Sequence, residues 1–578
     1  MIEDIYEPLR EYRDEFRERF SRLVSETFEN LTKRSGIDAE ANARQVARLR
    51  SLTAAIGRAR SVLRMKECLI ALAWLGVGAG MFFAWRSGSV LAAAGWEPVA
   101  DASDVFVLSV SATAGLLVLI FALLMPWRRR SIRRISELEV AHKACMDEAW
   151  RQMAPLNQLY DWDMATRMIQ AVVPRIGFDP YFNEARLHDL RAQFGWNDEF
   201  NSTRSVIFSQ SGQIKGNPFV FGECLRAEWG QKTYTGNLDI EWRERVTGAD
   251  GRSHWERRTE TLQASVTKPY PCFRDEKFLV FGNDAAPNLV FSRQPSDLSG
   301  LDDGFFYNRR KRQEMERLEE FSRNLDDEYG YTMMANKEFE TLFHATDRND
   351  EVEFRLLFTA LAQTQMLALL KDKSVGYGDD FAMYKDRRIN VIRSNHLCNA
   401  PLDTDPSRFW TYDYQDARRR FQSFHEQYFK DIYFTLAPLL SIPLYQQTRT
   451  HEDIYGDAAR RTASFWEHEA IANYFGDETF KHPSCVTRNI LKTSIVGRAG
   501  GTSTVAVTAY GYRGEARTEY VTVRGGDGER HSVPVEWIEY IPVSRTSRMT
   551  VSEYDGRRPS AIPEGQRWRR SILSGLKG

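Results

Sequence analysis

The sequence has no cysteine pair of the kind that binds zinc or carries redox chemistry. No Cys-x-x-Cys motif occurs, and the six cysteines stand singly, at Cys68, Cys145, Cys224, Cys272, Cys398 and Cys485. We interpret them as reduced, mostly buried thiols, because disulfides are rare in the cytosol. The part of the chain outside any membrane is therefore predicted to be cytosolic.

An excess of charge of either sign is also absent. The 78 Lys and Arg residues and the 79 Asp and Glu residues give a formal net charge of −1 at pH 7. No global field therefore draws the chain to nucleic acid. The basic run Arg309 to Arg312 continues into glutamates, which favours a solvated helix face over a phosphate-binding patch. We predict no nucleic-acid partner.

Motifs that mark a catalytic or cofactor site are missing as well. There is no Gly-x-x-x-x-Gly-Lys-Ser/Thr loop, no Gly-x-Gly-x-x-Gly fingerprint and no Gly-x-Ser-x-Gly elbow. The stretch FWEHEAIANY, from Phe465 to Tyr474, begins like a zinc-peptidase helix with His468 and Glu469. Position 472 holds alanine where the second histidine is required, and His482 lies beyond the helix. A helix that docks on a core is the favoured interpretation, with a metal site at His468 as the alternative.

Two other sets of residues can supply a nucleophile or an acid–base pair, since such groups often meet only in the fold. They are Cys272 with a distant histidine, and Glu353 with Asp347 and Asp350. Nothing in their spacing selects them over the remaining cysteines, histidines and carboxylates. The sequence therefore assigns no catalytic, cofactor-binding or metal-binding residue and no cofactor. It leaves enzymatic activity undecided, with a preference against it.

Two long apolar runs are the strongest positive signal. They are CLIALAWLGVGAGMFFAW, residues 68–85, and VFVLSVSATAGLLVLIFALLMPW, residues 105–127, and neither contains a charged side chain. A helix of about 20 apolar residues crosses a bilayer and satisfies its own backbone hydrogen bonds. We predict a transmembrane hairpin over residues 67–127, with the lipid bilayer as a partner.

The charges beside the runs predict the orientation of the hairpin. The connection 86–104 has one arginine against three acidic residues. The outer flanks are basic: Arg58, Arg60, Arg64 and Lys66 before the first run, and Arg128, Arg129, Arg130, Arg133 and Arg134 after the second. Positive flanks stay in the cytoplasm, so we expect an inner (plasma) membrane protein with both termini cytoplasmic.

Small residues lie in the middle of each span, with Gly76 and Gly80 in the first and Ser111 and Gly115 in the second. Such pairs let helices approach closely. Packing inside the hairpin is favoured over a dimer contact. No ionisable residue lies within either span, which argues against an ion pathway.

Amphipathic helices are predicted on both sides of the hairpin, in residues 1–66 and 128–200. Apolar residues near heptad spacing, such as Ile5, Leu9, Tyr12 and Phe16, are typical of a helix that needs a partner or of a coiled coil. We expect the two segments to pack together as a helical stalk. Homo-oligomerisation through the stalk and a monomeric helical bundle both remain open.

From Ser205 the hydrophobic period changes to that of strands. The segments 237–246, 254–266, 277–282, 381–385 and 387–392 predict antiparallel strands, and 309–330 and 350–370 predict helices. We therefore divide the rest into a cytosolic α+β domain (201–395), a mainly helical region (396–492), a small antiparallel β domain (493–553) and a disordered tail (554–578). The predicted fold class is a membrane-anchored α+β protein.

Three stretches resemble an uncharacterised bacterial family of two-span membrane proteins, the domain-of-unknown-function family 3137. They are KEFETLFHATDRNDEVEFRLLFTALAQTQML (337–367), FVFGECLRAE (219–228) and FAMYKDRRINVI (381–392). In the first, Glu353 and Arg355 lead to Thr359 as in a family pattern that ends in Thr-Pro, with Ala360 in place of the proline. The resemblance spans residues 56–392. It implies the same architecture, brings no established activity, and implies a LemA-type envelope protein as a partner.

Three functions remain as hypotheses. The first is a membrane-tethered cytosolic scaffold or protein-binding module, which the anchor, the amphipathic stripes and the missing motifs favour. The second is a membrane-bound hydrolase with a cytosolic active site. The third is a small pore of oligomerised hairpins.

Overall fold

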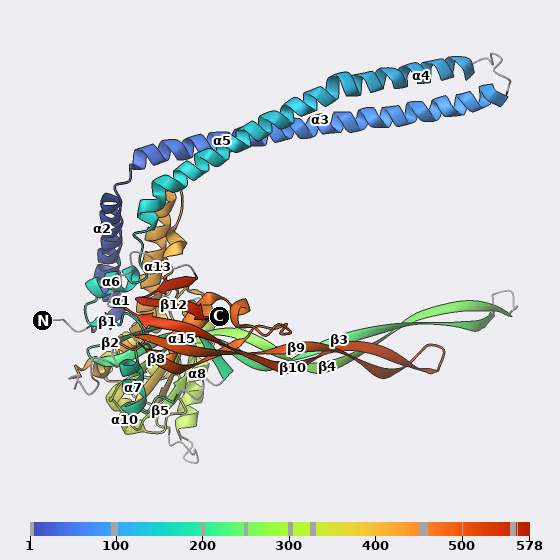
Figure 1. Ribbon diagram of the computed structural model, residues 1–578. Helices are drawn as coiled ribbons and strands as arrows, with labels where there is room; N and C mark the ends of the chain where they lie inside the picture. The colour runs from blue at the N-terminus through green and yellow to red at the C-terminus, as the bar shows by residue number, and fades with distance from the viewer. Residues whose placement is uncertain are drawn as a thin grey trace. The chain divides into compact units, whose positions relative to one another are not determined.

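The computed structural model of the protein describes residues 5–93, 102–197, 203–247, 253–298, 304–323, 331–449, 461–499, 501–554, 562 and 565–577. Figure 1 shows helices together with two twisted antiparallel sheets, so the α+β class predicted from the sequence is confirmed. The chain divides into two compact units. Unit 1 contains Met1–Val24, Asp161–Asp405 and Phe424–Gly578, and unit 2 contains Ser25–Tyr160 and Pro406–Ser423.

Two long apolar helices dominate unit 2. One is α3 (Ala39–Ala93), and the other runs through α4 (Ala102–Val118), the π-helical η2 (Leu119–Leu124) and α5 (Met125–Asn157). Both are long and apolar enough to cross a membrane. Only 11% and 17% of their most apolar 18-residue stretches is buried, unlike a core helix of a soluble protein. Both apolar runs are thus confirmed as helical, and residues 94–101 of the predicted connection lie outside the described residues.

Small residues bring the two long helices together. A side chain at Gly80 would overlap the Thr113 hydroxyl, and a Cβ at Gly76 would lie 3.0 Å from Leu116 Cδ1. Ile70, Val77, Ile120 and Leu124 form the buried seam between them. The predicted packing of the first glycine pair inside the hairpin is confirmed. The second small pair is not used in this way, because a Cβ at Gly115 would meet no atom within 4 Å.

The predicted stalk helices also pack together in unit 2. Gln45 on α3 donates to the carbonyl of Cys145 on α5 at 3.1 Å. Fully buried Asn42 accepts from the amide of Tyr414 and donates to the carbonyl of Tyr412, each at 3.0 Å. Because a buried amide side chain needs both partners, Asn42 fixes where the 406–423 segment joins α3.

The N-terminal stripe finds its partner within the same chain. It lies on α1 (Pro8–Glu11), the π-helical η1 (Tyr12–Phe16) and α2 (Arg17–Ser35). In unit 1, Phe20 stacks on Phe429 of α13 (Tyr414–Leu440) with ring centroids 4.2 Å apart, and Tyr12 contacts Phe434 at 4.8 Å. Self-association through the stalk stays a prediction.

The first sheet of unit 1 has seven antiparallel strands in the order β1-β2-β3-β4-β7-β6-β5. They are β1 (Ile176–Phe178), β2 (Arg204–Ile214), β3 (Asn217–Thr247), β4 (Ser253–Gly282), β5 (Val290–Arg293), β6 (Phe381–Asp386) and β7 (Ile389–Ser394). The strands predicted over 237–246, 254–266 and 277–282 fall within β3 and β4, which are much longer than expected. The strands predicted over 381–385 and 387–392 are β6 and β7, joined by a turn at Arg387, whose φ is 55°.

The second sheet has five antiparallel strands in the order β11-β12-β10-β9-β8. They are β8 (Ile490–Ala499), β9 (Thr502–Arg524), β10 (Arg530–Glu553), β11 (Gln566–Arg569) and β12 (Ile572–Lys577). The antiparallel strands predicted over 493–553 are therefore present, within unit 1, but the disorder predicted for the tail is wrong over 566–577. Its Arg-rich and Ser-rich composition misled the prediction, because Arg569, Arg570 and Ile572 are buried against distant parts of unit 1.

Helix α15 (Phe465–Phe475), which contains FWEHEAIANY, lies between the two sheets. Trp466 and Ala470 pack into the core of the first sheet, and Ile471, Ala472 and Phe475 into that of the second. The interpretation of this stretch as a docking helix is confirmed. Both faces of the helix are apolar because each covers a different sheet.

The remaining helices belong to unit 1, except η4, which belongs to unit 2. They are α6 (Met164–Val172), α7 (Glu184–Ala192), α8 (Phe305–Arg323), α9 (Lys337–Phe343), α10 (Glu351–Leu357), α11 (Ala360–Lys371), α12 (Asn395–Asn399), η4 (Pro406–Phe409), η5 (Pro443–Gln446) and α16 (Asp477–Phe480). The single helix predicted over 350–370 is wrong, since it is two helices. Asp350 caps α10, and the Thr359 side chain accepts from the amide of Ala362 to start α11 without a proline.

Candidate functional site

The two carboxylates of α15 are engaged in structural bonds. Glu467, 1% exposed, accepts from the Phe182 amide at 3.1 Å, the Ser209 hydroxyl at 3.0 Å and Arg570 at 3.1 Å. Glu469 accepts from the amide of Val206 at 3.0 Å. A buried carboxylate needs hydrogen-bond donors for its oxygens, and the protein supplies them here. These glutamates therefore join α15 to β2 and to the C-terminal hairpin.

His468 is fully buried, and neither ring nitrogen has a hydrogen-bond partner among the described residues. Burial lowers the pKa of His468 to about 4, so the ring is neutral at pH 7. His482 hydrogen-bonds instead to Ser484, with 2.8 Å between Nδ1 and Oγ. In the described part of the chain no group of three or more His, Cys, Asp or Glu side chains is placed to hold a metal ion.

The other candidate acids cap backbone groups. Asp350 accepts from the amide of Glu353 at 2.9 Å, and Glu353 accepts from the amide of Asn288 at 2.9 Å. Asp347 accepts from the amide of Ser292 at 2.9 Å. These three acids therefore connect α10, and the segment before it, to β5 and the residues before β5. They do not converge on one point.

All six cysteines are free thiols, and Cys145, Cys224 and Cys485 are buried. Cys272, the candidate nucleophile, is half-buried on β4 opposite Glu228 of β3. It hydrogen-bonds to Tyr270, and this contact raises the pKa of the tyrosine. The geometry gives Cys272 a tyrosine neighbour and not the acid–base partner that the hypothesis required.

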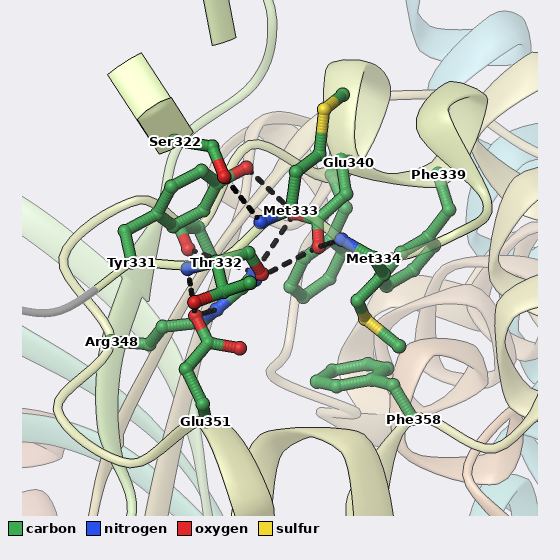
Figure 2. A network of polar contacts seen from close by, with 12 residues as sticks. Ser322, Tyr331, Thr332, Met333, Met334, Phe339, Glu340, Arg348, Glu351 and Phe358 are labelled. Carbon is green, nitrogen blue, oxygen red and sulfur yellow. Dashed lines mark hydrogen bonds and ion pairs between the residues drawn. The ribbon is translucent and has the colours of Figure 1, made fainter. Parts of the chain in front are cut away.

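A buried polar network that the sequence did not indicate lies between α8, α9 and α10 (Figure 2). Arg348, with no exposed side-chain surface, forms two parallel bonds to Glu340 at 2.8 and 2.9 Å and a third to Glu351 at 2.7 Å. It also donates to the carbonyl of Thr332 at 2.8 Å, and its guanidinium lies 4.5 Å from the Tyr331 ring centroid. All these partners are internal, so the network holds the loops between the helices.

A histidine–aspartate pair, which in other folds can act as a catalytic dyad, is also present. Nδ1 of His396 lies 2.6 Å from Asp380, and the ring stacks on Tyr377 with centroids 4.0 Å apart. The other nitrogen, Nε2, lies 2.9 Å from the buried hydroxyl of Thr435 and 3.1 Å from the carbonyl of Asp431. Both ring nitrogens are engaged, so His396 links α12 to α13 and has no lone pair available for a substrate.

The most distinctive feature of unit 1 is an extended pair of hairpins, which we call the β arm (Figure 1). It consists of residues 227–247 and 253–273 of β3 and β4, and 511–524 and 530–543 of β9 and β10. Beyond Arg226, β3 pairs only with β4 in the described ladder, so the first hairpin leaves the sheet as a two-stranded ribbon. At about 3.3 Å per residue this ribbon extends roughly 70 Å from the sheet.

The two ribbons of the β arm pack face to face and share a small core of their own. Side chains alternate between buried and exposed along each strand, and the inward ones are Ile240, Leu262, Ala264, Val266, Val533 and Val535, with Leu238, Trp242 and Trp537 at the edges. Gly236 faces the carbonyl of Pro534 so closely that a side chain would overlap it. Lys268 of one ribbon pairs with Glu519 of the other at 2.5 Å. A two-stranded ribbon alone is marginal in water, and this second layer stabilises it.

The end of the β arm lies beyond the second ribbon. The turn of β9–β10 closes at Gly526, whose amide donates to Glu260 at 2.6 Å. The last stretch, 243–247 and 253–257, has no second layer among the described residues, and cross-strand ion pairs such as Arg258 with Glu244 at 3.4 Å mark its beginning. Trp255 there is 68% exposed, as is Tyr520 on the outer face of β9. An exposed tryptophan near the end of a projecting hairpin is typical of a binding surface.

Comparison with protein-family models, curated proteins and solved structures finds no match to this chain. The resemblance to family 3137 therefore stays a prediction.

Proposed function

We propose that the protein is a membrane-tethered scaffold that presents the β arm to a protein partner in the cytosol. The observation that carries the proposal is that the arm has its own core between its two ribbons. Packing of this kind keeps a long projection rigid, and a rigid surface binds with less loss of conformational entropy. The exposed Trp255 near its end supplies an aromatic anchor of the type that dominates protein interfaces.

The anchor in this proposal is the pair of long apolar helices of unit 2. Their exposed side chains would lie in lipid, and the basic residues that flank both runs would stay on the cytoplasmic side. We accordingly propose an inner (plasma) membrane location with both termini cytoplasmic. A cysteine introduced in the 86–104 connection should react with an impermeant thiol reagent added to intact cells, whereas one next to the C-terminus should react only after lysis.

A photo-crosslinking residue at position 255 of the full chain, in native membranes, tests the binding role. We expect a protein adduct at Trp255 and none at Trp150, an exposed tryptophan of unit 2 that serves as the matched control. An adduct with twice the mass of the chain would identify a second copy as the partner. A LemA-type protein is the partner that the family resemblance implies. If neither position 255 nor position 520 gives an adduct, the arm is not a binding surface.

A shortened arm gives a second test of the same proposal. Arg243 and Arg257 are directly cross-strand, so an Asn-Gly turn can replace residues 244–256 and leave every residue of the shared core in place. We expect the shortened protein to melt like the native one and to lose its partner in co-purification from membranes. Retention of the same partner would contradict the role assigned to the end of the arm.

A further inference from the structure

A cavity of about 770 Å³ lies in unit 1 and shares no lining residue with the core of the β arm. Helices α8, α9 and α11 and the loop from α11 to β6 line it. Its volume lies within the range of about 300–1,000 Å³ that is usual for small-molecule sites. Leu298, Leu342 and Leu370 give it an apolar part, and Asn308 and Asn395 add hydrogen-bonding groups.

Three lysines from different elements reach this cavity. Lys311 of α8 and Lys371, the last residue of α11, both donate to the same oxygen, Oε1 of Glu338. Lys373 in the following loop and Lys311 lie 5.8 and 5.9 Å from the ring centroid of Tyr307. Glu338 and Tyr307 thus hold three ammonium groups around one space.

The remaining carboxylates of the cavity wall are occupied elsewhere. Asp372 accepts from the amides of Ser374 and Val375, each at 3.1 Å. Asp379 pairs with fully buried Arg293, and Asp380 with His396. Glu338 is therefore the carboxylate that Lys311 and Lys371 share. Although burial opposes its ionisation, the bonds from these two lysines hold the pKa of Glu338 below its usual value, so it is charged at pH 7.

Lys311 and Lys371 thus direct two ammonium groups to one carboxylate oxygen, in a partly enclosed space whose wall also carries Asp372, Asp379 and Asp380. We propose that this cavity binds a small molecule with a phosphate monoester, whose phosphate takes the place of Glu338 between the lysines. A phosphate dianion matches several ammonium groups better than one carboxylate does, and lysine binds phosphate as a point charge without fixed geometry. The leucines and asparagines of the wall would contact the organic part of the ligand.

The full chain in phosphatidylcholine nanodiscs is the material for the test, with inorganic phosphate and glycerol 3-phosphate as probes in calorimetric titrations. We expect saturable binding of both, tighter for the glycerol ester because it also meets the wall. Phosphatidic acid in the nanodisc distinguishes the two sources of such a phosphate. If the natural ligand is a lipid headgroup, phosphatidic acid in the nanodisc will block the binding of glycerol 3-phosphate. If the natural ligand is a soluble metabolite, phosphatidic acid will leave the binding of glycerol 3-phosphate unchanged.

Substitutions at the cluster give effects of opposite sign. K311Q and K371Q should each weaken glycerol 3-phosphate binding about tenfold, whereas E338Q should tighten it about threefold or more, because it removes the competing carboxylate. K143Q, at an exposed position of α5 in unit 2, is the matched control and should bind like the native protein. Unchanged melting temperatures would show that the variants fold.

Two results would overturn the proposal. If E338Q weakens binding as much as the lysine variants do, the cluster is a structural ion pair and not a ligand site. If binding of both probes is not saturable, or does not change in the K311Q/K371Q double variant, phosphate does not occupy this cavity.

Discussion

Arg570 donates to Oε1 of Glu467 at 3.1 Å, and each side chain is only 1% exposed. The bond joins the last hairpin of the chain to α15. Arg570 lies at the turn between β11 and β12, where it and Ser571 have φ of 47° and 63°. Such a backbone conformation is unfavourable for residues other than glycine. The buried contact between Arg570 and Glu467 therefore stabilises the turn.

Arg570→Ala should therefore destabilise unit 1 strongly. It leaves the buried carboxylate of Glu467 with Arg569, 3.7 Å away, as its remaining countercharge, so a loss of about 3 kcal/mol is expected, the lower end for a broken buried ion pair. Thermal unfolding in detergent measures the effect. The double variant R570A/E467Q should recover part of the loss. Arg513→Ala, which breaks an exposed pair with Glu515, is the control and should cost less than about 1 kcal/mol.

Replacement of Arg348 by lysine tests the buried network of Figure 2. Lysine keeps the charge but cannot form the two parallel bonds to Glu340 together with the bond to Glu351, so we expect a loss of about 2–4 kcal/mol. Hydrogen exchange of residues 331–351 should become faster. Arg355→Lys, at a half-exposed position 3.6 Å from Glu351, should leave that exchange unchanged. Equal exchange in both variants would contradict a stabilising role for the network.

A bulky residue at position 236 should separate the two ribbons of the β arm. Gly236→Val places a side chain against the carbonyl of Pro534, and overpacking of this kind costs about 1–3 kcal/mol. Protection of the amides in 511–543 should fall, while the body of the sheets stays protected. Thr235→Val, which points to the exposed face, is the control. Unchanged protection in G236V would show that the ribbons do not depend on close packing.

The same reasoning applies to the two apolar helices of unit 2. Gly80→Leu would force α3 away from Thr113, whereas Gly78→Leu meets open space, with no atom within 4 Å of its Cβ. We expect G80L to lower the melting temperature in detergent and G78L to leave it within about 2 °C, the range of a small change in stability. Equal effects would mean that the helices do not pack through this glycine.

His468 makes the stability depend on pH in the acid range. Its folded pKa of about 4 lies below the usual value of 6.5, so the unfolded chain binds a proton between these values and the folded protein does not. Stability is therefore lost as the pH falls from about 6.5 to about 4, by at most about 3 kcal/mol. His468→Phe should reduce this acid-side loss in denaturation curves measured across that range. His482→Gln, on the surface, should not alter it.

The pattern of apolar residues along the chain predicted the helices and strands whose formation depends on neighbouring residues. The apolar runs are helical because a helix satisfies its own backbone hydrogen bonds, and the alternation in 237–246 and 254–266 is that of strands with one buried face. FWEHEAIANY could be assigned as a docking helix because its apolar residues surround the helix. The missing second histidine by itself removed the simplest metal site from consideration.

The sequence could not predict the candidate sites, because each site is formed by residues that are distant from one another along the chain. Nothing near Glu338 indicates that Lys311 and Lys371 share its oxygen, and nothing near Arg348 indicates that Tyr331 and Glu340 surround it. The tail composition predicted disorder, yet Arg570 is held by Glu467 across the fold. Composition reports the average solubility of a segment, whereas a single buried ion pair can fix its structure.

The sequence by itself determined the two apolar helices, the α+β class and the strand-rich character of the segments that follow. Only the tertiary structure decided that two hairpins stack into one β arm, that α15 separates two sheets, and that three lysines gather in one cavity. The physical reason is that periodicity shows which face of an element is buried but not what buries it. Which element covers that face depends on contacts between elements that are distant from each other in the sequence.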